Sequence, residues 1–156
     1  MTCDPHRVLF VCTYNSVRSP MAAAILNAAT DNRYTAESTG LFPSPVDPGV
    51  VAVMRERGID LSSHQPRPLG ACSETAYGTI VFLSPAVRER ACRIPSAGEI
   101  HTLNIPVPGA SGADGLDGYR QLCRVLADAI AACFPDAGVV GLHRKKALSD
   151  ADSELF

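Results

Sequence analysis

The sequence predicts an α/β fold built on a parallel sheet, and two observations lead to that prediction. Two apolar runs, Val8 to Val11 and Ile80 to Leu83, are rich in residues that favour strands and show no alternation of polar and apolar positions. Runs of this kind are typical of central parallel strands that helices cover on both faces. Patterns typical of helices lie between and after these runs, and such alternation favours a parallel sheet with right-handed crossovers.

The first strand is expected at Val8 to Val11, and a helix should follow it closely. Ser19 and Pro20 predict the start of that helix, because a serine N-cap followed by proline is a common helix opening. A weaker second strand is expected from Tyr34 to Ser38.

The second helix has clear signals at both ends. Asp47 and Pro48 repeat the pattern of an N-cap followed by proline, and Gly58 is expected to end the helix. The apolar run Ile80 to Leu83 then forms the next central strand.

The second half of the chain adds a strand from Ile100 to Asn104 and a long amphipathic helix from about Leu116 to Cys133. Between them lies a Gly/Pro-rich loop, Pro106 to Gly118. Its length is typical of functional loops, although a flexible excursion is the plainer interpretation.

The length of 156 residues predicts one domain, placed at residues 1–140, with a tail at 141–156. The tail has a basic cluster, then acidic residues and little to bury, so we expect it to be flexible. No signal-peptide pattern precedes the first strand, and no apolar run approaches the ~18 residues of a membrane helix. We therefore expect a cytoplasmic protein that does not enter a membrane.

Charge and cysteine content exclude some classes of partner and cofactor. The net charge is −2 and basic residues do not gather on one predicted element, so nucleic acid is not an expected partner. Neither a cofactor nor a metal site is expected. Scattered cytosolic thiols are usually buried hydrophobic groups or catalytic groups. No close CxxC pair occurs among the six cysteines, which are Cys3, Cys12, Cys72, Cys92, Cys123 and Cys133.

The segment from Cys12 to Ser19 joins the first predicted strand to the first predicted helix. In open α/β sheets, ligands bind beyond the carboxyl ends of the strands, where a loop leads into a helix. Successive backbone N–H groups in such a loop form a nest for anions, and the helix dipole strengthens it. The sequence therefore predicts an oxyanion site at this loop.

Cys12 and Arg18 flank this loop. A cysteine beside a helix N-terminus and a cation ionises readily, so we expect a thiolate at Cys12 near neutral pH. Arg18 carries a planar fork of donors that can hold two oxygens of a tetrahedral anion. Together they indicate nucleophilic attack on a bound phosphoryl group. The plainer alternative is a buried, inert Cys12 and a surface Arg18.

The segment VCTYNSVRSP at 11–20 resembles the low-molecular-weight protein tyrosine phosphatase family, whose superfamily includes thioredoxin-coupled arsenate reductases. The resemblance continues through ESTG at 37–40, PVDPGVVAVMRERGIDLSSHQPRPL at 45–69 and TIVFLSP at 79–85. It implies a phosphatase-like domain at 1–140. The implied fold has three layers, with helices on both faces of a four-stranded parallel sheet and a phosphate-binding loop after the first strand.

The resemblance implies roles for residues in and around the loop. Cys12 is the nucleophile that forms a thiophosphate intermediate, Arg18 clamps the phosphoryl oxygens, and Ser19 stabilises the thiolate as it leaves. Ser38 and His64 support the loop through hydrogen bonds, although His64 alone would be interpreted as a surface histidine beside a helix. The phosphate-binding loop itself consists of Thr13, Tyr14, Asn15, Ser16 and Val17, in which the asparagine holds the loop in shape.

Three positions depart from the family pattern. Tyr14 stands where glycine is common, and its bulk is expected to change the loop or line the pocket. Val17 stands where many members carry a second cysteine that protects the nucleophile by a disulfide. Val107, in Val107-Pro108, stands where the family has the aspartic acid that protonates the leaving group.

The missing acid affects the expected chemistry but does not exclude it. General acid catalysis contributes roughly 10²- to 10⁴-fold and matters most for a poor leaving group such as a tyrosine phenolate, with a pKa of about 10. Good leaving groups should still be displaced. Asp114 and Asp117 are the nearby carboxylates that could replace the acid, although capping and solvation explain them more simply.

Three functions remain open. The first is a phosphatase for a phosphorylated protein or a small aryl phosphate, with inorganic phosphate or a similar oxyanion able to bind the loop. The second is an arsenate reductase that needs a thiol reductant: Cys92 lies near one relay position, but Pro85 occupies the other, so Cys72 or an external thiol would have to serve. The third is a binding module for an anion or phosphopeptide, with little turnover.

Overall fold

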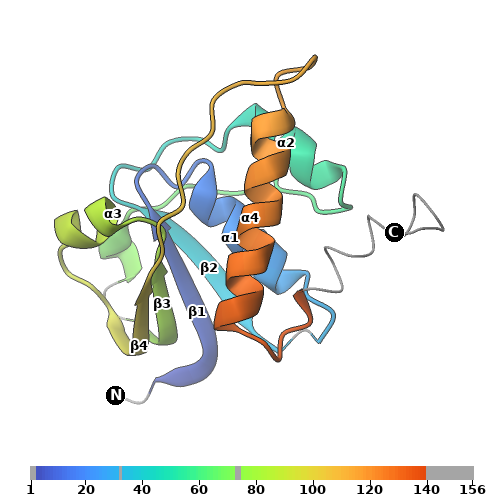
Figure 1. The fold of residues 1–156 in the computed structure, drawn as a ribbon. Helices are drawn as coiled ribbons and strands as arrows, with labels where there is room; N and C mark the ends of the chain where they lie inside the picture. The colour runs from blue at the N-terminus through green and yellow to red at the C-terminus, as the bar shows by residue number, and fades with distance from the viewer. Residues whose placement is uncertain (1–2, 32, 73–74, 140–156) are drawn as a thin grey trace.

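The computed structural model describes residues 3–31, 33–72 and 75–139, and its centre is a four-stranded sheet (Figure 1). The strands are β1 (Asp4–Cys12), β2 (Thr35–Gly40), β3 (Ala76–Phe82) and β4 (Ser96–Thr102). All neighbouring strands are parallel, in the order β2-β1-β3-β4. The prediction of an α/β fold with a four-stranded parallel sheet is therefore confirmed, and the two apolar runs lie in its central strands.

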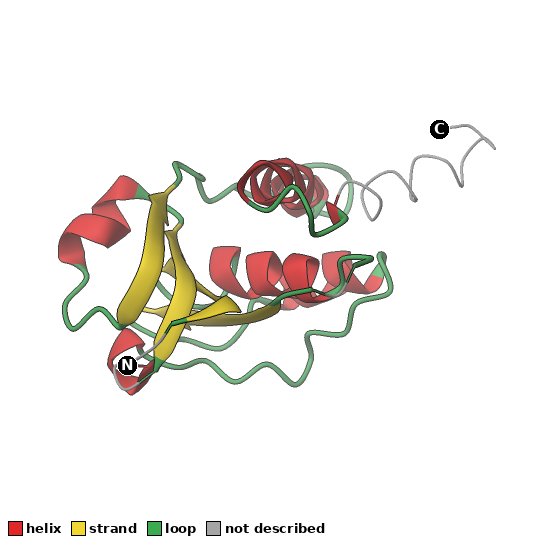
Figure 2. Cartoon of the chain, turned by 90° about the horizontal axis from the view of Figure 1, so that it is seen from below, coloured by secondary structure: helices red, strands yellow, loops and turns green. Residues whose placement is uncertain are grey.

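Helices cover both faces of the sheet and give the fold its three layers (Figure 2). One face packs against α1 (Arg18–Asn27), α2 (Pro48–Arg55) and α4 (Asp117–Cys133). The opposite face packs against a short 3₁₀ helix, η1 (Leu69–Cys72), and α3 (Pro85–Arg90).

Alternate residues of β1 pack into these two cores. Val8 and Phe10 pack with the core that contains α1 and α4, whereas Leu9 and Val11 pack with the core that contains η1 and α3. Because both faces are buried from Val8 to Val11, this part of the strand has no polar positions to alternate with the apolar ones.

The start of α1 differs from the expectation. The helix begins at Arg18, its N-cap is Val17, and no side chain caps it. The Ser19 hydroxyl is hydrogen-bonded to Cys12 Sγ and to the Thr39 carbonyl. It does not cap the helix because these bonds occupy it.

The expected start of α2 is confirmed, and α3 repeats the same signal. Asp47 is the N-cap of α2 and accepts a hydrogen bond from the Gly49 amide. Ser84 caps α3 by accepting from the Val87 amide, with proline at the next position. α3 was not predicted from the sequence, although Ser84-Pro85 is the same kind of N-terminal signal.

Other boundaries differ by a few residues. β4 begins at Ser96, four residues before the expected strand, and α4 begins at Asp117, close to its expected start. The tail at 141–156 lies outside the described residues. Across the residues that the structure does describe, no helix has the length and apolar character needed to cross a membrane.

Candidate active site

Cys12 is the last residue of β1, and residues 13–17 form the loop that leads from it into α1. We call this segment the 13–17 loop. Main-chain hydrogen bonds join it to a neighbouring segment. The Phe42 amide donates to the Thr13 carbonyl at 2.8 Å, and the Ser44 amide donates to the Tyr14 carbonyl at 2.9 Å. The Asp47 amide donates to Ser16 at 2.9 Å. Segments that follow β2 and precede α2 therefore fix the shape of this loop.

The Cys12 side chain is buried, and Ser19 provides its polar contacts. Its sulfur lies 2.9 Å from Ser19 Oγ and 3.4 Å from the Ser19 amide nitrogen. Ser19 has one hydroxyl proton, and the Thr39 carbonyl is an alternative acceptor at 3.1 Å. The same proton can therefore be donated to a sulfur anion when one forms.

Asn15 is the only residue of the 13–17 loop with a positive φ, at 55°. Its side chain is fully used: Nδ2 donates to Ser19 Oγ at 2.9 Å and to Ser38 Oγ at 3.0 Å, and Oδ1 accepts from the Arg67 amide at 3.0 Å. Asparagine tolerates this backbone region better than most residues, and a conformation of this kind persists where its surroundings hold it.

Gly40 allows the loop to approach β2. A Cβ atom at Gly40 would lie 2.6 Å from the Asn15 backbone nitrogen, well inside normal contact. The glycine in the ESTG segment is therefore needed for space and not for an unusual φ.

Arg18 is buried beneath the loop, so the alternative of a surface arginine is wrong. Its guanidinium donates to the Ile105 carbonyl at 3.0 Å and to Thr13 Oγ1 at 3.1 Å. Within the described part of the chain no carboxylate pairs with it. Its positive charge is therefore available to an anion in the loop.

Ser38 and His64 both lie behind the loop. Ser38 accepts from Asn15 Nδ2, as described above. Burial and the nearby Arg67 charge hold the pKa of His64 below its usual value, although a hydrogen bond to the Asn15 carbonyl opposes this. His64 is therefore neutral at pH 7. Its buried Nε2 has no hydrogen-bond partner among the described residues.

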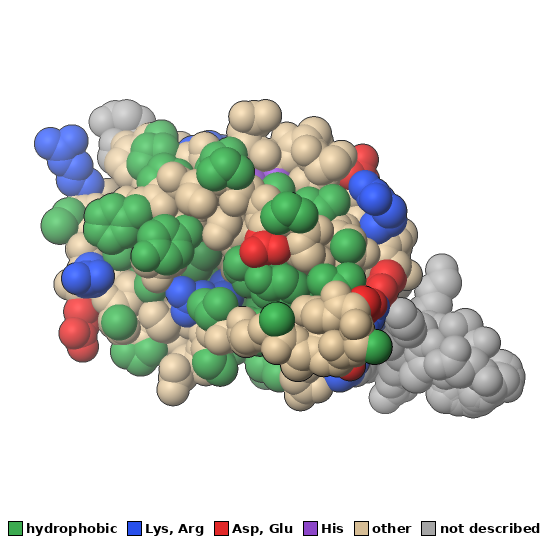
Figure 3. Space-filling model, turned by 90° about the horizontal axis from the view of Figure 1, so that it is seen from above, with side chains coloured by type: hydrophobic (Ala, Val, Ile, Leu, Met, Phe, Trp, Pro, Cys, Tyr) green, Lys and Arg blue, Asp and Glu red, His purple; other side chains and the backbone are tan. Residues whose placement is uncertain are grey.

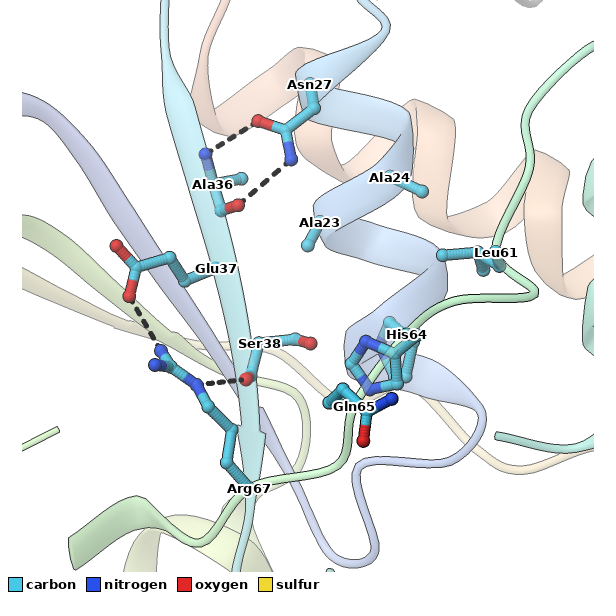
Figure 4. Close-up of a pocket in the computed structure, with 11 residues that line it drawn as sticks. Ala23, Ala24, Asn27, Ala36, Glu37, Ser38, Leu61, His64, Gln65 and Arg67 are labelled. Atoms are coloured by element: carbon cyan, nitrogen blue, oxygen red, sulfur yellow. Dashed lines mark hydrogen bonds and ion pairs between the residues drawn. The ribbon is translucent and has the colours of Figure 1, made fainter. Parts of the chain in front are cut away.

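A pocket of about 250 Å³ lies beside these residues, between α1, β2 and the segment that contains His64 (Figure 4). Its wall includes Ser38, His64, Gln65 and Arg67. Arg67 was not singled out from the sequence, although its amide contacts the 13–17 loop directly.

Among the described residues, the three positions considered for a general acid, Val107, Asp114 and Asp117, are poor proton donors or are held in ion pairs. Val107 is 55% exposed and has no proton to give. Asp114 and Asp117 both accept hydrogen bonds from Arg120, which also pairs with Glu56. Hydrogen bonds from Arg120 and from the Leu116 amide hold the pKa of Asp114 below its usual value. Asp114 is therefore an anion at neutral pH and a poor proton donor.

Asp47, which was predicted only as a helix cap, also contacts the 13–17 loop through its main-chain amide. Its Oδ1 accepts from the Gly49 amide, and its Oδ2 accepts from the Tyr119 hydroxyl at 3.0 Å. The stretch PVDPG at 45–49 lies within the family resemblance, which was the available signal.

The rim of the site is apolar. Tyr14 and Phe42 are more than half exposed, and the Phe42 amide is bonded to the loop. Val107 is equally exposed and comes two residues after Ile105, whose carbonyl accepts a hydrogen bond from Arg18. Figure 3 views the face onto which the carboxyl ends of the strands open, and hydrophobic side chains gather there. This rim suits an uncharged group on the ester side of a bound phosphate.

The six cysteines are all free thiols. Cys72 is buried in η1 and belongs to the core on the opposite face of the sheet, whereas Cys92 is exposed after α3. Pro85 is the first residue of α3. In the described ranges no cluster of three or more His, Cys, Asp or Glu residues is arranged to hold a metal ion.

A family model for low molecular weight phosphotyrosine protein phosphatases matches residues 7–120, which include the strand, the loop and most of the residues around them. The chain belongs to this family. The resemblance noted from the sequence is therefore confirmed. As a member of the low molecular weight phosphatase family, the chain is also similar to several named proteins.

The relatives include phosphatases and arsenate reductases. The probable low molecular weight protein-tyrosine-phosphatase EpsP of Ralstonia solanacearum is 32% identical over 134 residues, covering 80% of this chain and 86% of that protein. A glutaredoxin arsenate reductase of Synechocystis is 34% identical over 77 residues, covering 49% of this chain. The match spans 59% of the reductase's own length.

Solved structures of other proteins share the fold. A low molecular weight protein tyrosine phosphatase from T. tengcongensis is 31% identical, with a TM-score of 0.66 over 80% of this chain and 94% of its own. An arsenate reductase in its oxidised state has a TM-score of 0.67 over 88% of this chain and 98% of its own, at 21% identity. The second comparison bears on the fold alone.

Proposed function

We propose that the protein hydrolyses phosphotyrosine or other aryl phosphate monoesters, with Cys12 as the nucleophile. The observation that carries this proposal is the setting of the Cys12 thiol. It is buried at the start of the 13–17 loop and hydrogen-bonded to Ser19, and the Arg18 guanidinium is bonded to Thr13 of the same loop. The nucleophile Cys12, the anion-binding Arg18 and Ser19, which donates to the sulfur when it leaves, therefore lie around one small site.

The reaction has two steps. Cys12 sulfur attacks phosphorus, the S–P bond forms, and the bond from phosphorus to the ester oxygen breaks, while Arg18 and the loop N–H groups hold the other oxygens. Water then attacks phosphorus, the S–P bond breaks, and phosphate is released with a proton from that water. The sulfur leaves as a thiolate that accepts the Ser19 hydroxyl proton in a hydrogen bond.

The missing acid limits the first step. Because Val107 cannot donate a proton and Asp114 is held ionised, the leaving oxygen departs as an anion or takes its proton from solvent. Esters of acidic phenols should therefore react faster than esters of ordinary phenols such as tyrosine.

Arsenate reduction is the second candidate, and the exposed Cys92 favours it. Arsenate is tetrahedral like phosphate, so Cys12 could attack it. Reduction of As(V) to As(III) then takes two electrons from two thiols, which form a disulfide. Pro85 occupies the other relay position, so an external thiol such as a thioredoxin or glutathione would complete the reaction. A third candidate, a binding module for anions, is favoured only by Val107, which cannot donate a proton to a leaving group.

Trapping the intermediate tests the proposal. We expect rapid acid quench of the enzyme with p-nitrophenyl phosphate to yield a phosphate group on the Cys12 peptide, detected by mass spectrometry. Cys12→Ser should lose that product and all turnover, while Cys92→Ser, which removes an exposed thiol, should keep both. Turnover that persists in Cys12→Ser would overturn the proposal. Arsenate-dependent consumption of thiol, sensitive to Cys92→Ser and without phosphatase turnover, would favour the reductase.

A further inference from the structure

Residues 64–68 run beside the edge strand β2 and form neither a helix nor a regular strand. Main-chain bonds of Arg67 join this segment to the rest of the molecule. Its amide donates to Asn15 Oδ1 at 3.0 Å, and its carbonyl accepts from the Gly40 amide at 3.1 Å and from Thr39 Oγ1 at 2.8 Å. The position of the Arg67 main chain therefore determines one of the three bonds of the Asn15 side chain.

The Arg67 side chain is itself held by β2 (Figure 4). Its guanidinium donates to Glu37 Oε1 at 2.7 Å and to the Ser38 carbonyl at 3.5 Å. The Glu37 ion pair is partly buried, and an ionic hydrogen bond of this length is among the stronger ones. One residue thus bonds to the 13–17 loop through its main chain and to the sheet through its side chain.

Glu37 is a well-fixed anchor. The Tyr77 hydroxyl from β3 donates to it at 2.8 Å, and Arg7 from β1 pairs with its other oxygen at 2.6 Å. The Cys72 thiol from η1 lies close to Tyr77 and Arg67. Burial raises the pKa of the Glu37 carboxyl, but the hydrogen bonds from Tyr77, Arg67 and Arg7 outweigh it and hold that pKa below its usual value.

The other end of the connection is the Cys12 thiol. Asn15 has a left-handed backbone and a buried side chain that donates to Ser19 Oγ, which lies 2.9 Å from Cys12 Sγ. If the Arg67 amide moved away, the Asn15 side chain would lose its one acceptor contact. Its amide group could then turn, and the Ser19 hydroxyl would lose a donor that fixes its orientation.

We propose that Glu37 is a positioning residue for Cys12, because it holds Arg67 in the place from which the Arg67 amide fixes Asn15 and, through Asn15, the Ser19 hydroxyl. The inference rests on the proposed role of Cys12 as the nucleophile. It assigns to the glutamate of the ESTG segment an effect on thiol reactivity from the far side of β2.

Arg7 provides a matched control. It bonds to the same carboxylate as Arg67 and lies over the ring of Tyr77, whose hydroxyl also donates to that carboxylate. Unlike Arg67, it has no bond to the 13–17 loop. Arg7→Gln therefore removes one ion pair of Glu37 but keeps the contacts that lead from Glu37 through Arg67 to Asn15. Glu37→Gln and Arg67→Ala both remove the ion pair with which those contacts begin.

The test measures two properties of each variant: steady-state hydrolysis of p-nitrophenyl phosphate, and the pH profile of Cys12 alkylation by iodoacetamide, followed on the Cys12 peptide. We expect Glu37→Gln and Arg67→Ala each to lower kcat about 3- to 10-fold, the effect of weakening one hydrogen bond, with a smaller change in KM. Both should shift the alkylation midpoint to higher pH. The double variant should be no worse than the more impaired single variant, because both changes cut one connection.

Arg7→Gln should match the wild type in both measurements. The inference is overturned if Glu37→Gln retains wild-type kcat and alkylation profile, if Arg7→Gln causes the same losses, or if the two losses add in the double variant. Should Glu37→Gln fail to fold, as judged by thermal melting, the comparison of Arg67→Ala with Arg7→Gln decides the matter. A wild-type protein without turnover refutes the proposed function, while the alkylation profiles still test this inference.

Discussion

A single hydroxyl proton, that of Ser19, can serve two acceptors in the structure, the Thr39 carbonyl and the Cys12 sulfur. When Cys12 is a neutral thiol, the Ser19 hydroxyl donates to the Thr39 carbonyl, and when the sulfur is an anion, the hydroxyl donates to the sulfur. The Asn15 amide group donates to the same oxygen and strengthens whichever bond that proton makes. Ser19, supported by Asn15, can therefore stabilise a negative charge on the Cys12 sulfur.

Arg18 should not be replaceable by lysine. Its guanidinium spans the Ile105 carbonyl and the Thr13 hydroxyl, and a single ammonium group has neither that width nor a planar pair of donors for phosphate. We expect Arg18→Lys to weaken inhibition by inorganic phosphate and to lower kcat together, each by about 10- to 100-fold, as for charged hydrogen bonds. An unchanged inhibition constant would show that Arg18 does not bind the anion.

Because we propose that Val107 occupies the position of the family's general acid, an acid can be introduced there. Val107→Asp should raise the rate for phenyl phosphate, a poor leaving group, far more than for esters of acidic phenols, with an upper limit of about 10²- to 10⁴-fold. Val107→Asn is the control, because it has similar size and polarity but no acidic proton. Equal gains for both kinds of ester, or an equal gain in the asparagine variant, would show that position 107 does not face the leaving oxygen.

At the scale of elements, α2 begins where the 13–17 loop is held from outside. Asp47 caps the helix with its carboxylate, bonds to Ser16 with its amide and receives the hydroxyl of Tyr119 from α4. Burial, together with this bond to Asp47, raises the pKa of the Tyr119 hydroxyl. One residue thus joins two helices to the loop.

We expect Asp47→Ala to lower the free energy of unfolding by about 1–2 kcal/mol, through loss of the helix cap and of the Tyr119 acceptor. Asp47→Asn retains an oxygen for the cap and should lose much less. Urea denaturation of the two variants measures the difference. If alanine and asparagine cost the same, capping is not what Asp47 contributes to stability.

The sequence predicted the elements whose signals are local. The apolar runs gave β1 and β3, Asp47-Pro48 gave α2, and the spacing of apolar residues gave α4. The predicted start of α1 was wrong because the Ser19 hydroxyl is hydrogen-bonded to Cys12, a contact that a capping rule does not consider. In the same way, the link from Arg67 to Asn15 crosses 52 positions, and that from Arg67 to Glu37 crosses 30. Such pairs become visible only when the sheet brings them together.

At the scale of the whole molecule, the segment that runs beside β2 brings a histidine, His64, against the Asn15 backbone of the 13–17 loop. The folded pKa of His64 is lower than its unfolded value of about 6.5. Above pH 6.5 both states hold the ring neutral. As the pH falls below that value, the unfolded state takes up the proton more readily, so stability is lost toward the folded pKa.

We therefore expect the urea midpoint of the wild type to fall between pH 7 and pH 5.5, and we expect His64→Gln to reduce that fall. Glu37 does not interfere in this range, because the pKa of its carboxyl lies below its ordinary value near 4.5 and its contribution is lost only in stronger acid. The same pH dependence in both proteins would show that protonation of His64 does not destabilise the fold.

Steady-state hydrolysis of a series of aryl phosphates with leaving groups of graded pKa, and with Cys12→Ser as the blank, is the most direct test of a Cys12 nucleophile that acts without a general acid. A nucleophile that works without its acid predicts a kcat that falls steeply as the leaving-group pKa rises, and no turnover in the blank. A flat profile would mean that some group donates a proton to the leaving oxygen. Turnover in the blank would contradict the role of Cys12 itself.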